Sequence, residues 1–312
     1  MRVKVKEYAY YPGCSLKESA RQYEESLLRS FAELGLELVE LEDWNCCGST
    51  LCRVTGGLDP LALTARDLAL AGRDHEGRDP VVPCSACLLS FIKAEERLER
   101  DPEARRRVGE ALRVAGLDLE VGLKVRVRHP LEVLDDLGLE EIGRRVKRPL
   151  QDLKVAPYYG CLLVRPYNRL DHPLYPEAMD RLLLHLGAEV VDYPLKTGCC
   201  GGAITGMAVA VAEEPGLSLN YALLKEAQER GADAIVTLCP LCQFNLDCYQ
   251  GRISEKYRLE STIPVIYFTQ VLGLALGIPE EELGFGREMV SVKGLLAVLR
   301  LRCGWVQPAN LD

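Results

Sequence analysis

The chain of 312 residues has only four histidines, no long apolar run and no excess of positive charge. Its formal net charge is −8, which argues against a surface that binds the phosphates of a nucleic acid. The longest nearly apolar stretches, 271–278 and 294–299, are far shorter than the roughly 20 residues that cross a bilayer as a helix. Residues 1–7 also lack the apolar run of a signal peptide. We therefore expect a cytoplasmic protein with no nucleic-acid partner.

The rest of the composition is that of a folded protein with an unusual amount of cysteine. Apolar residues make up 48% and charged residues 27%, so an ordinary buried core is expected. The length suggests about two domains. The 13 cysteines need an explanation, because clustered cysteines in a cytoplasmic chain of this size bind metal or do redox chemistry more often than they form disulfides.

Two adjacent cysteines followed by glycine occur twice, at 46–48 and at 199–201. Neighbouring side chains on a strand point to opposite faces. Both sulfurs of a pair therefore serve one site only if the backbone turns there, and glycine permits that turn. The repetition predicts two copies of a sulfur-rich site.

Each cysteine pair lies in a matching frame of three further cysteines. The two sets are Cys14, Cys46, Cys47, Cys84 and Cys87, and Cys161, Cys199, Cys200, Cys239 and Cys242. The last two members of each set form a Cys-x-x-Cys motif between an expected strand and an expected helix, whose N-terminus lowers the pKa of a thiol. Ordinary cubane clusters and structural zinc sites use four ligands, so five sulfurs in duplicate favour a less common metal cluster.

Strands and helices are expected to alternate in both halves. Strands are predicted at 7–11, 36–41, 80–83, 154–159, 188–193 and 234–238, and helices at 15–34, 58–75, 176–187 and 206–230. This alternation predicts an α/β fold of two tandem, structurally repeated domains with parallel sheets, 1–148 and 149–312, related by a pseudo-twofold axis. The cysteine motifs follow strands, so we expect them at the carboxyl edges of the sheets, with the two sites face to face.

Two local features refine this plan. The tail at 125–134 resembles that at 265–272 with an offset of 138, whereas the Cys-x-x-Cys motifs are 155 apart. The first half therefore carries 17 extra residues, which we place in the charged helix 103–114. Ser15 and Glu18 have the spacing of a capping box and predict the start of the helix at 15–34.

Other interpretations of the cysteines stay open at this point. They include structural zinc, a thioredoxin-like dithiol at Cys239 and Cys242, and thiols buried for packing. Cys52, Cys248 and Cys303 have no counterpart in the other half, and we interpret them as core or incidental thiols, with Cys52 and Cys248 as reserve candidates. Among the histidines, His129 lies in the repeated tail and is a weak candidate for a catalytic proton donor, the alternative being a structural role.

Several segments together resemble the B subunit of heterodisulfide reductase, a member of the CCG-domain family of cysteine-rich iron–sulfur proteins. They are Tyr-Tyr-Pro-Gly-Cys-Ser-Leu at 10–16, Asp-Trp-Asn-Cys-Cys-Gly at 43–48, Gly-Cys-Cys-Gly-Gly at 198–202, Cys-Pro-Leu-Cys-Gln-Phe-Asn-Leu at 239–246 and Tyr-Phe-Thr-Gln at 267–270. The resemblance spans nearly the whole chain. One departure is Leu162, which stands where the family often has a histidine; it leaves the ligand set unchanged.

The resemblance implies two CCG domains, each holding a non-cubane [4Fe–4S] cluster through its five matching cysteines. It further implies that the clusters flank a disulfide substrate and cleave it reductively. The implied partners are an iron–sulfur protein like the C subunit of heterodisulfide reductase and a flavoprotein subunit that feeds it.

Two other function classes remain. CCG domains also resemble parts of complexes that oxidise lactate, glycolate or succinate, where the module would pass electrons towards quinone. The segment 292–301 would then contact a membrane or a partner, although a docking or core helix is the favoured interpretation. The third class is a zinc-binding scaffold without redox activity.

Overall fold

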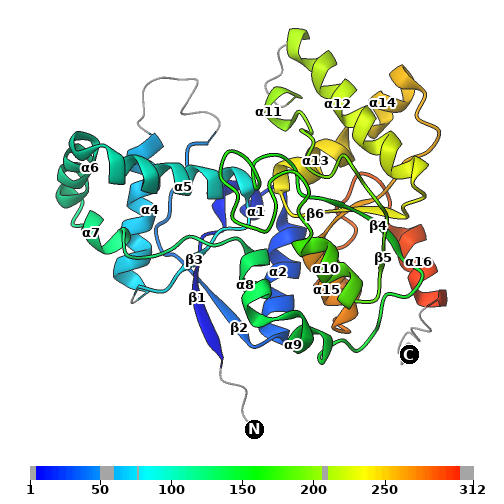
Figure 1. The fold of residues 1–312 in the computed structure, drawn as a ribbon, viewed down its shortest axis with the longest axis horizontal. Helices are drawn as coiled ribbons and strands as arrows, with labels where there is room; N and C mark the ends of the chain where they lie inside the picture. The colour runs from blue at the N-terminus through cyan, green and yellow to red at the C-terminus, as the bar shows by residue number, and fades with distance from the viewer. Residues whose placement is uncertain (1–4, 50–59, 76, 206–209, 303–312) are drawn as a thin grey trace.

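The computed structural model describes residues 5–49, 60–75, 77–205 and 210–302. The first half of the chain lies on one side of the molecule and most of the second half on the other (Figure 1). Each half contains a parallel sheet with helices around it. The α/β class predicted from the alternation of strands and helices is therefore confirmed.

The first sheet has three strands in the order β2-β1-β3, and every pairing is parallel. Its strands are β1 (Lys6–Tyr10), β2 (Leu36–Glu40) and β3 (Pro80–Val81). The helices of this half that follow the predicted pattern are α1 (Gly13–Lys17), α2 (Arg21–Glu33), α4 (Pro60–Asp74) and α5 (Ser85–Arg100).

The second sheet has the order β5-β4-β6-β7, again with parallel pairings only. Its strands are β4 (Lys154–Tyr158), β5 (Glu189–Val190), β6 (Ala234–Thr237) and β7 (Val265–Tyr267). The helices are α10 (Ala178–His185), α11 (Gly202–Thr205), α12 (Ala210–Glu229), α13 (Pro240–Cys248), α14 (Gln250–Tyr257), α15 (Phe268–Ala275) and α16 (Lys293–Arg302), with the 3-10 turn η1 (Glu280–Glu282). The first three strands are ordered alike in both sheets, which confirms the tandem repeat.

The repeated tail forms a full strand only in the second half. In the first half Arg128 makes one isolated parallel bridge to Val81, and the N–H of Arg126 donates to the Asp79 carboxylate, 2.9 Å away. The helices after the two tails, α8 (Pro130–Leu137) and α15, begin in the same way, and the short α9 (Leu139–Gly143) follows α8. In both helices, a side chain of the first turn accepts the backbone N–H of the residue just before the helix. Glu132 accepts from His129 at 2.7 Å, and Gln270 accepts from Tyr267 at 2.9 Å.

The extra residues of the first half form two helices of their own, α6 (Pro102–Val114) and α7 (Leu119–Gly122). Both helices pack against α4 and close a small hydrophobic cluster that is separate from the main core. The insertion therefore lies where the charge pattern placed it, at the outer end of the first half (Figure 1).

The two halves exchange helices in a symmetric way. Helix α2 of the first half packs against α15 of the second, and its counterpart α10 packs against α8, the counterpart of α15. At the first contact the hydroxyls of Ser26 and Thr269 lie 2.7 Å apart, and the Ser30 hydroxyl donates to the Thr269 carbonyl at 3.0 Å. One continuous hydrophobic core includes residues of both halves. This reciprocal packing is what a pseudo-twofold axis between the halves produces.

The prediction of a capping box at Ser15 is wrong. Ser15 lies inside α1, and its carbonyl accepts the backbone N–H groups of Glu18, at 3.2 Å, and Ala20, at 2.8 Å. These bonds close the short helix, and α2 begins separately at Arg21. The single helix predicted at 15–34 is therefore two helices, α1 and α2, with a break between Lys17 and Arg21.

Helix α16 turns its apolar stripe inward. Val292, Leu295, Leu296 and Leu299 are buried and belong to the main core, whereas Leu301 is exposed. This burial agrees with the favoured interpretation of the segment as a core helix. Within the described residues, every helix is too short or too polar to cross a membrane.

Candidate metal centre

The cysteine motifs lie at the carboxyl ends of the parallel strands, as predicted. In the first half Cys14 follows β1, the Cys46–Cys47 pair follows β2 and Cys84 follows β3. In the second half the corresponding cysteines follow β4, β5 and β6. Since the strands of each sheet run in one direction, their carboxyl ends share an edge, and the five cysteines of each set converge there.

The thiols of each set meet in pairs. In the first set the sulfurs of Cys46 and Cys14 are 4.0 Å apart and those of Cys47 and Cys87 are 3.2 Å apart. In the second set the sulfurs of Cys200 and Cys242 are 3.5 Å apart, and Cys161 and Cys199 share a side-chain hydrogen bond. Each set thus has a buried inner group and an outer pair that reaches the surface.

Backbone N–H groups in the Cys-Cys-Gly loops point at the sulfurs. Gly48 and Gly201 have φ values of +68° and +71°, which a residue with a side chain rarely adopts. The turns aim the N–H of Gly201 at the Cys199 sulfur and that of Gly202 at the Cys200 sulfur, both at 3.3 Å. In the first loop Gly48 and Ser49 donate in the same way to the two cysteines. Such donors stabilise thiolates, the form of cysteine that binds metal.

A tyrosine ties each loop to its sheet. The Tyr11 hydroxyl donates to the carbonyl of Asn45 at 2.9 Å, and the Tyr158 hydroxyl donates to the carbonyl of Gly198 at 2.8 Å. Both carbonyls belong to the residue before the cysteine pair. Burial raises the pKa of both tyrosines far above the usual value, so both remain donors. Sequence reasoning missed this pair, although each tyrosine stands three residues before the first cysteine of its set.

The glycine before the first cysteine brings the backbone against an inner sulfur. Gly13 and Gly160 both have φ of +69°. A Cβ added at Gly13 would lie 3.3 Å from the Cys87 sulfur, and one at Gly160 would lie 3.0 Å from the Cys242 sulfur. Only glycine fits both the conformation and the space at these two positions.

The outer pairs share protons unequally. The hydrogen bond with Cys14 lowers the pKa of Cys46, and the hydrogen bond with Cys161 lowers the pKa of Cys199 to about 6. The same bonds raise the pKa of Cys14 and of Cys161. In both halves the thiol whose pKa is lowered is the first cysteine of the adjacent pair.

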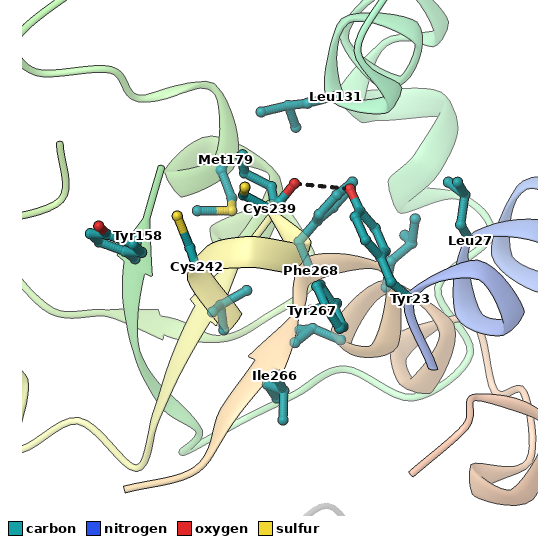
Figure 2. Packing of buried hydrophobic residues seen from close by; sticks show 14 of the residues in the cluster. Tyr23, Leu27, Leu131, Tyr158, Met179, Cys239, Cys242, Ile266, Tyr267 and Phe268 are labelled. Carbon is teal, nitrogen blue, oxygen red and sulfur yellow. Dashed lines mark hydrogen bonds between the residues drawn. The ribbon is translucent and has the colours of Figure 1, made fainter. Parts of the chain in front are cut away.

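The two sets meet through their Cys-x-x-Cys motifs. Cys84 and Cys239 are the N-cap residues of α5 and α13, both are buried, and their side chains hydrogen-bond to each other. Beside them the Tyr23 ring stacks on the Tyr267 ring, with centroids 4.3 Å apart, and the Tyr23 hydroxyl donates to the carbonyl of Leu238 at 3.2 Å. Figure 2 shows Tyr23, Tyr267 and Phe268 packed beside Cys239.

His129 is engaged at both ring nitrogens. Its Nδ1 accepts the N–H of Leu131 at 3.1 Å, so Nε2 carries the proton and faces the Pro83 carbonyl at 3.2 Å. The side chain is fully buried, and burial lowers its pKa to about 4. This geometry favours a neutral histidine that fixes the start of α8 over a proton donor.

The three remaining cysteines belong to neither set. Cys248 is partly buried on α13, and Cys52 and Cys303 lie outside the described residues. Across the described ranges, no three His, Cys, Asp or Glu side chains are placed closely enough to hold a single metal ion. The thiols are arranged as the pairs given above.

The residues of each set fit a group rich in iron and sulfur. Thiolate is the ligand such clusters take from proteins, and each set supplies five sulfurs with N–H donors beside them. The hydroxyl of Ser85, inside the first Cys-x-x-Cys motif, is buried without a hydrogen-bond partner in the described structure. A donor to a cluster sulfur is one role that such a hydroxyl fills.

Comparisons with known proteins agree with this arrangement. The model of the CCG family, described as a cysteine-rich domain, matches residues 8–92 and 155–247. The chain is 33% identical over 292 residues to the 8-methylmenaquinol:fumarate reductase membrane anchor subunit of Wolinella succinogenes, covering 93% of this chain and 99% of that one. It is 31% identical over 304 residues to the B subunit of the ferredoxin/F(420)H(2)-dependent CoB-CoM heterodisulfide reductase of Methanosarcina acetivorans, covering 94% and 97%.

A solved structure shares the fold. A hypothetical protein from Helicobacter pylori superposes with a TM-score of 0.69 at 16% identity, over 93% of this chain. This chain spans about half of that solved chain, 53% of its length. The duplicated cysteine motifs, the two family matches and the extended identity to the B subunit of heterodisulfide reductase lead to one conclusion: the chain belongs to the CCG cysteine-rich domain family.

Proposed function

We propose that the protein is the electron-transfer subunit of an oxidoreductase complex and holds two [4Fe–4S] clusters, one in each cysteine set. The ligands would be the ten cysteines of the two sets, and the boundary between the two CCG domains would fall near residue 148. Five sulfurs per site exceed the four of a cubane, which supports the non-cubane type. The family match and the repeated thiol geometry support the assignment.

The reaction we propose is the reduction of a disulfide that binds between the two sites. The observation that carries it is the contact between Cys84 and Cys239, which brings the two cysteine sets together. The disulfide takes up two electrons and two protons, its S–S bond breaks, and two thiols are formed. The electrons would come from an iron–sulfur partner, like the C subunit of heterodisulfide reductase, that a flavoprotein supplies. An iron–sulfur cluster, when bound, supplies electrons one at a time.

The residues of the chain have three tasks in this scheme. The N–H groups of Gly201 and Gly202 donate to the sulfurs of Cys199 and Cys200 and fix their positions. Tyr11 and Tyr158 fix the loops on which the pairs lie. The exposed outer thiols, Cys14 and Cys46 in the first set and Cys199 in the second, mark the side from which a substrate or a partner would approach.

A second candidate is transfer of electrons between a dehydrogenase partner and a quinone. Its support is the identity of 33% to a protein named for methylmenaquinol and fumarate, which covers nearly the whole of both chains. In this scheme the protein would bind at the cytoplasmic side of a membrane through its partners. Both candidates use the same two clusters and differ in the partner that supplies electrons and in the acceptor that receives them.

Metal content tests the common part first. After strictly anaerobic purification we expect about eight irons and eight acid-labile sulfides per chain. About two zincs and no sulfide would instead identify a zinc scaffold and reject the proposal.

Activity then separates the two acceptors. With a reduced viologen dye as the electron donor, mixed disulfides should be reduced to thiols at a rate that Cys200→Ser abolishes. Wild-type disulfide turnover in that variant would reject the two-cluster reaction. Reduction of a soluble menaquinone analogue with no disulfide turnover would favour the second candidate.

A further inference from the structure

Asn220 has a buried side-chain amide outside the two cysteine sets. It lies in the middle of α12 and is fully buried. In the part of the chain that the structure describes, neither its Nδ2 nor its Oδ1 has a hydrogen-bond partner. A buried amide is normally paired, so an unpaired one points to a group that the protein alone does not supply.

The position of Asn220 on its helix places it under the second Cys-Cys-Gly loop. Residues 216, 220 and 223 share one face of α12 because they are four and three residues apart. Gly216 is the nearest neighbour of Gly201, where an added Cβ would lie 2.9 Å from its Cα. Leu223 lies beside Gly198, 3.3 Å from the Cβ position, and its carbonyl accepts from the Tyr193 hydroxyl. Asn220 therefore lies between two contacts with this loop.

The first repeat has a different residue at the matching position. Asp67 and Asn220 each stand 21 residues after the first cysteine of their pair, Cys46 and Cys199. Asp67 is also fully buried, but its carboxylate is in use: Oδ1 accepts the N–H of Asn45 at 2.9 Å, and Oδ2 accepts from the Asn45 side chain at 3.2 Å. In the second repeat the N–H of Gly198 donates to the Leu195 carbonyl instead, at 2.8 Å.

We propose that Asn220 is a positioning residue whose amide N–H donates to a sulfur atom of the cluster in the second site, while Asp67 only holds the first loop in place. This inference rests on the proposed function. It makes the duplicated sites chemically unequal. Hydrogen bonds to the sulfurs of a cluster stabilise its reduced form, since they offset the added negative charge. The hydrogen bond from Asn220 therefore makes the second site easier to reduce than it would be without that bond.

The test replaces Asn220 with an apolar side chain of similar size and compares two states of the protein. In the iron-free protein, Asn220→Leu should raise the midpoint of thermal unfolding, because it removes an unpaired buried amide. The matched variant Asp67→Leu should lower that midpoint, because it breaks the bonds to Asn45.

In the cluster-loaded protein, an anaerobic redox titration followed by electron paramagnetic resonance measures each site. The signal of the second site is identified by its loss in Cys200→Ser. At a fixed potential, Asn220→Leu should lower the ratio of reduced to oxidised second site at least tenfold, about 59 mV for one electron. Asp67→Leu should leave that ratio unchanged. Asn220→Ala, with a smaller side chain, should give the same change and guards against a packing defect in the leucine variant.

Two results would overturn the inference. One is a lower unfolding midpoint of both iron-free Asn220 variants, which would show that the amide has a structural partner. The other is an unchanged second-site potential in variants that still hold eight irons. That second result leaves the proposed function intact. The absence of iron and sulfide from the wild-type protein would reject both the inference and the proposed function.

Discussion

Cys84 and Cys239 occupy equivalent positions in the two repeats and hydrogen-bond to each other where the repeats meet. Each also caps a helix and belongs to a Cys-x-x-Cys motif. A residue in contact with its own equivalent lies on the twofold axis that relates the repeats. The two candidate metal sites are thus joined through the buried thiols of Cys84 and Cys239.

Loss of either thiol should empty one site. Cys84→Ala and Cys239→Ala should each reduce the iron content from about eight to about four per chain, because a cluster that loses a ligand from its buried side is not retained. Iron and sulfide analysis of anaerobically prepared protein measures this. Cys248→Ala is the control and should keep about eight irons, since Cys248 lies outside both sets. Full iron content in both Cys84→Ala and Cys239→Ala would exclude these two residues as ligands.

Removal of one hydroxyl should weaken each loop by a similar amount. Tyr11→Phe and Tyr158→Phe leave a loop carbonyl without its donor, so each should lower the free energy of unfolding by about 1–2 kcal/mol. Urea unfolding of the iron-free protein measures the change. In Tyr175→Phe the lost bond to Asp192 is exposed, and little change is expected. A cost confined to one of the two buried tyrosines would show that the loops are not equivalent.

A methyl group added at the glycine before the first cysteine of either set should displace an inner sulfur of that set. Gly13→Ala and Gly160→Ala combine a left-handed backbone, which costs about 1–2 kcal/mol, with a Cβ 3.0–3.3 Å from an inner sulfur. We expect lower stability and loss of iron from the altered site. Gly77→Ala is the matched control: its φ is +74° but nothing lies within 4 Å of the new Cβ, so iron should be retained. Equal iron content in all three variants would argue against the close approach.

The buried His129 should make stability depend on pH. Its folded pKa of about 4 is below the ordinary value near 6.5, so between these values the unfolded chain binds a proton that the folded chain refuses. Stability is therefore lost as the pH falls from 6.5 to 4, by roughly 3 kcal/mol in full. His129→Asn keeps a side chain that caps a helix but does not titrate, and its unfolding free energy should fall less over this range. Urea unfolding at pH 7, 5.5 and 4.5 compares the iron-free wild type with the iron-free variant. An equal loss of unfolding free energy in both proteins would contradict the low pKa of His129.

Much of the fold follows from the cysteine motifs and the strands before them. Because all sheet pairings are parallel, motifs that follow strands reach one edge, and the sets Cys14–Cys87 and Cys161–Cys242 converge as the spacing indicates. The failure at Ser15 is local. The capping box fails there because a backbone carbonyl takes the N–H groups that a new helix would need. A difference between the repeats is equally local: the tail near Arg126 forms no full strand, because the Asp79 side chain takes its N–H.

The finer features of the site could not be predicted from the sequence. The spacing of Tyr11 and Tyr158 from the cysteines is visible in the sequence, but the carbonyls they bind are more than 30 residues away. The contact between Cys84 and Cys239 depends on how two separate sheets dock. Asn220 has an ordinary place on an amphipathic helix, and only the equal spacing from the cysteine pairs links it to Asp67.

The reciprocal packing of α2 on α15 and of α10 on α8 has a consequence for the origin of the chain. Each half covers the other as the protomers of a homodimer do, with a thiol at the axis facing its own copy. This is the arrangement expected of a homodimer of single repeats whose genes later fused into one chain. Fragments 1–148 and 149–312, produced together, should co-purify as a complex, and separate elution would contradict this history. Two repeats in one chain can differ from each other, and here one has a carboxylate, Asp67, under its loop whereas the other has an amide, Asn220.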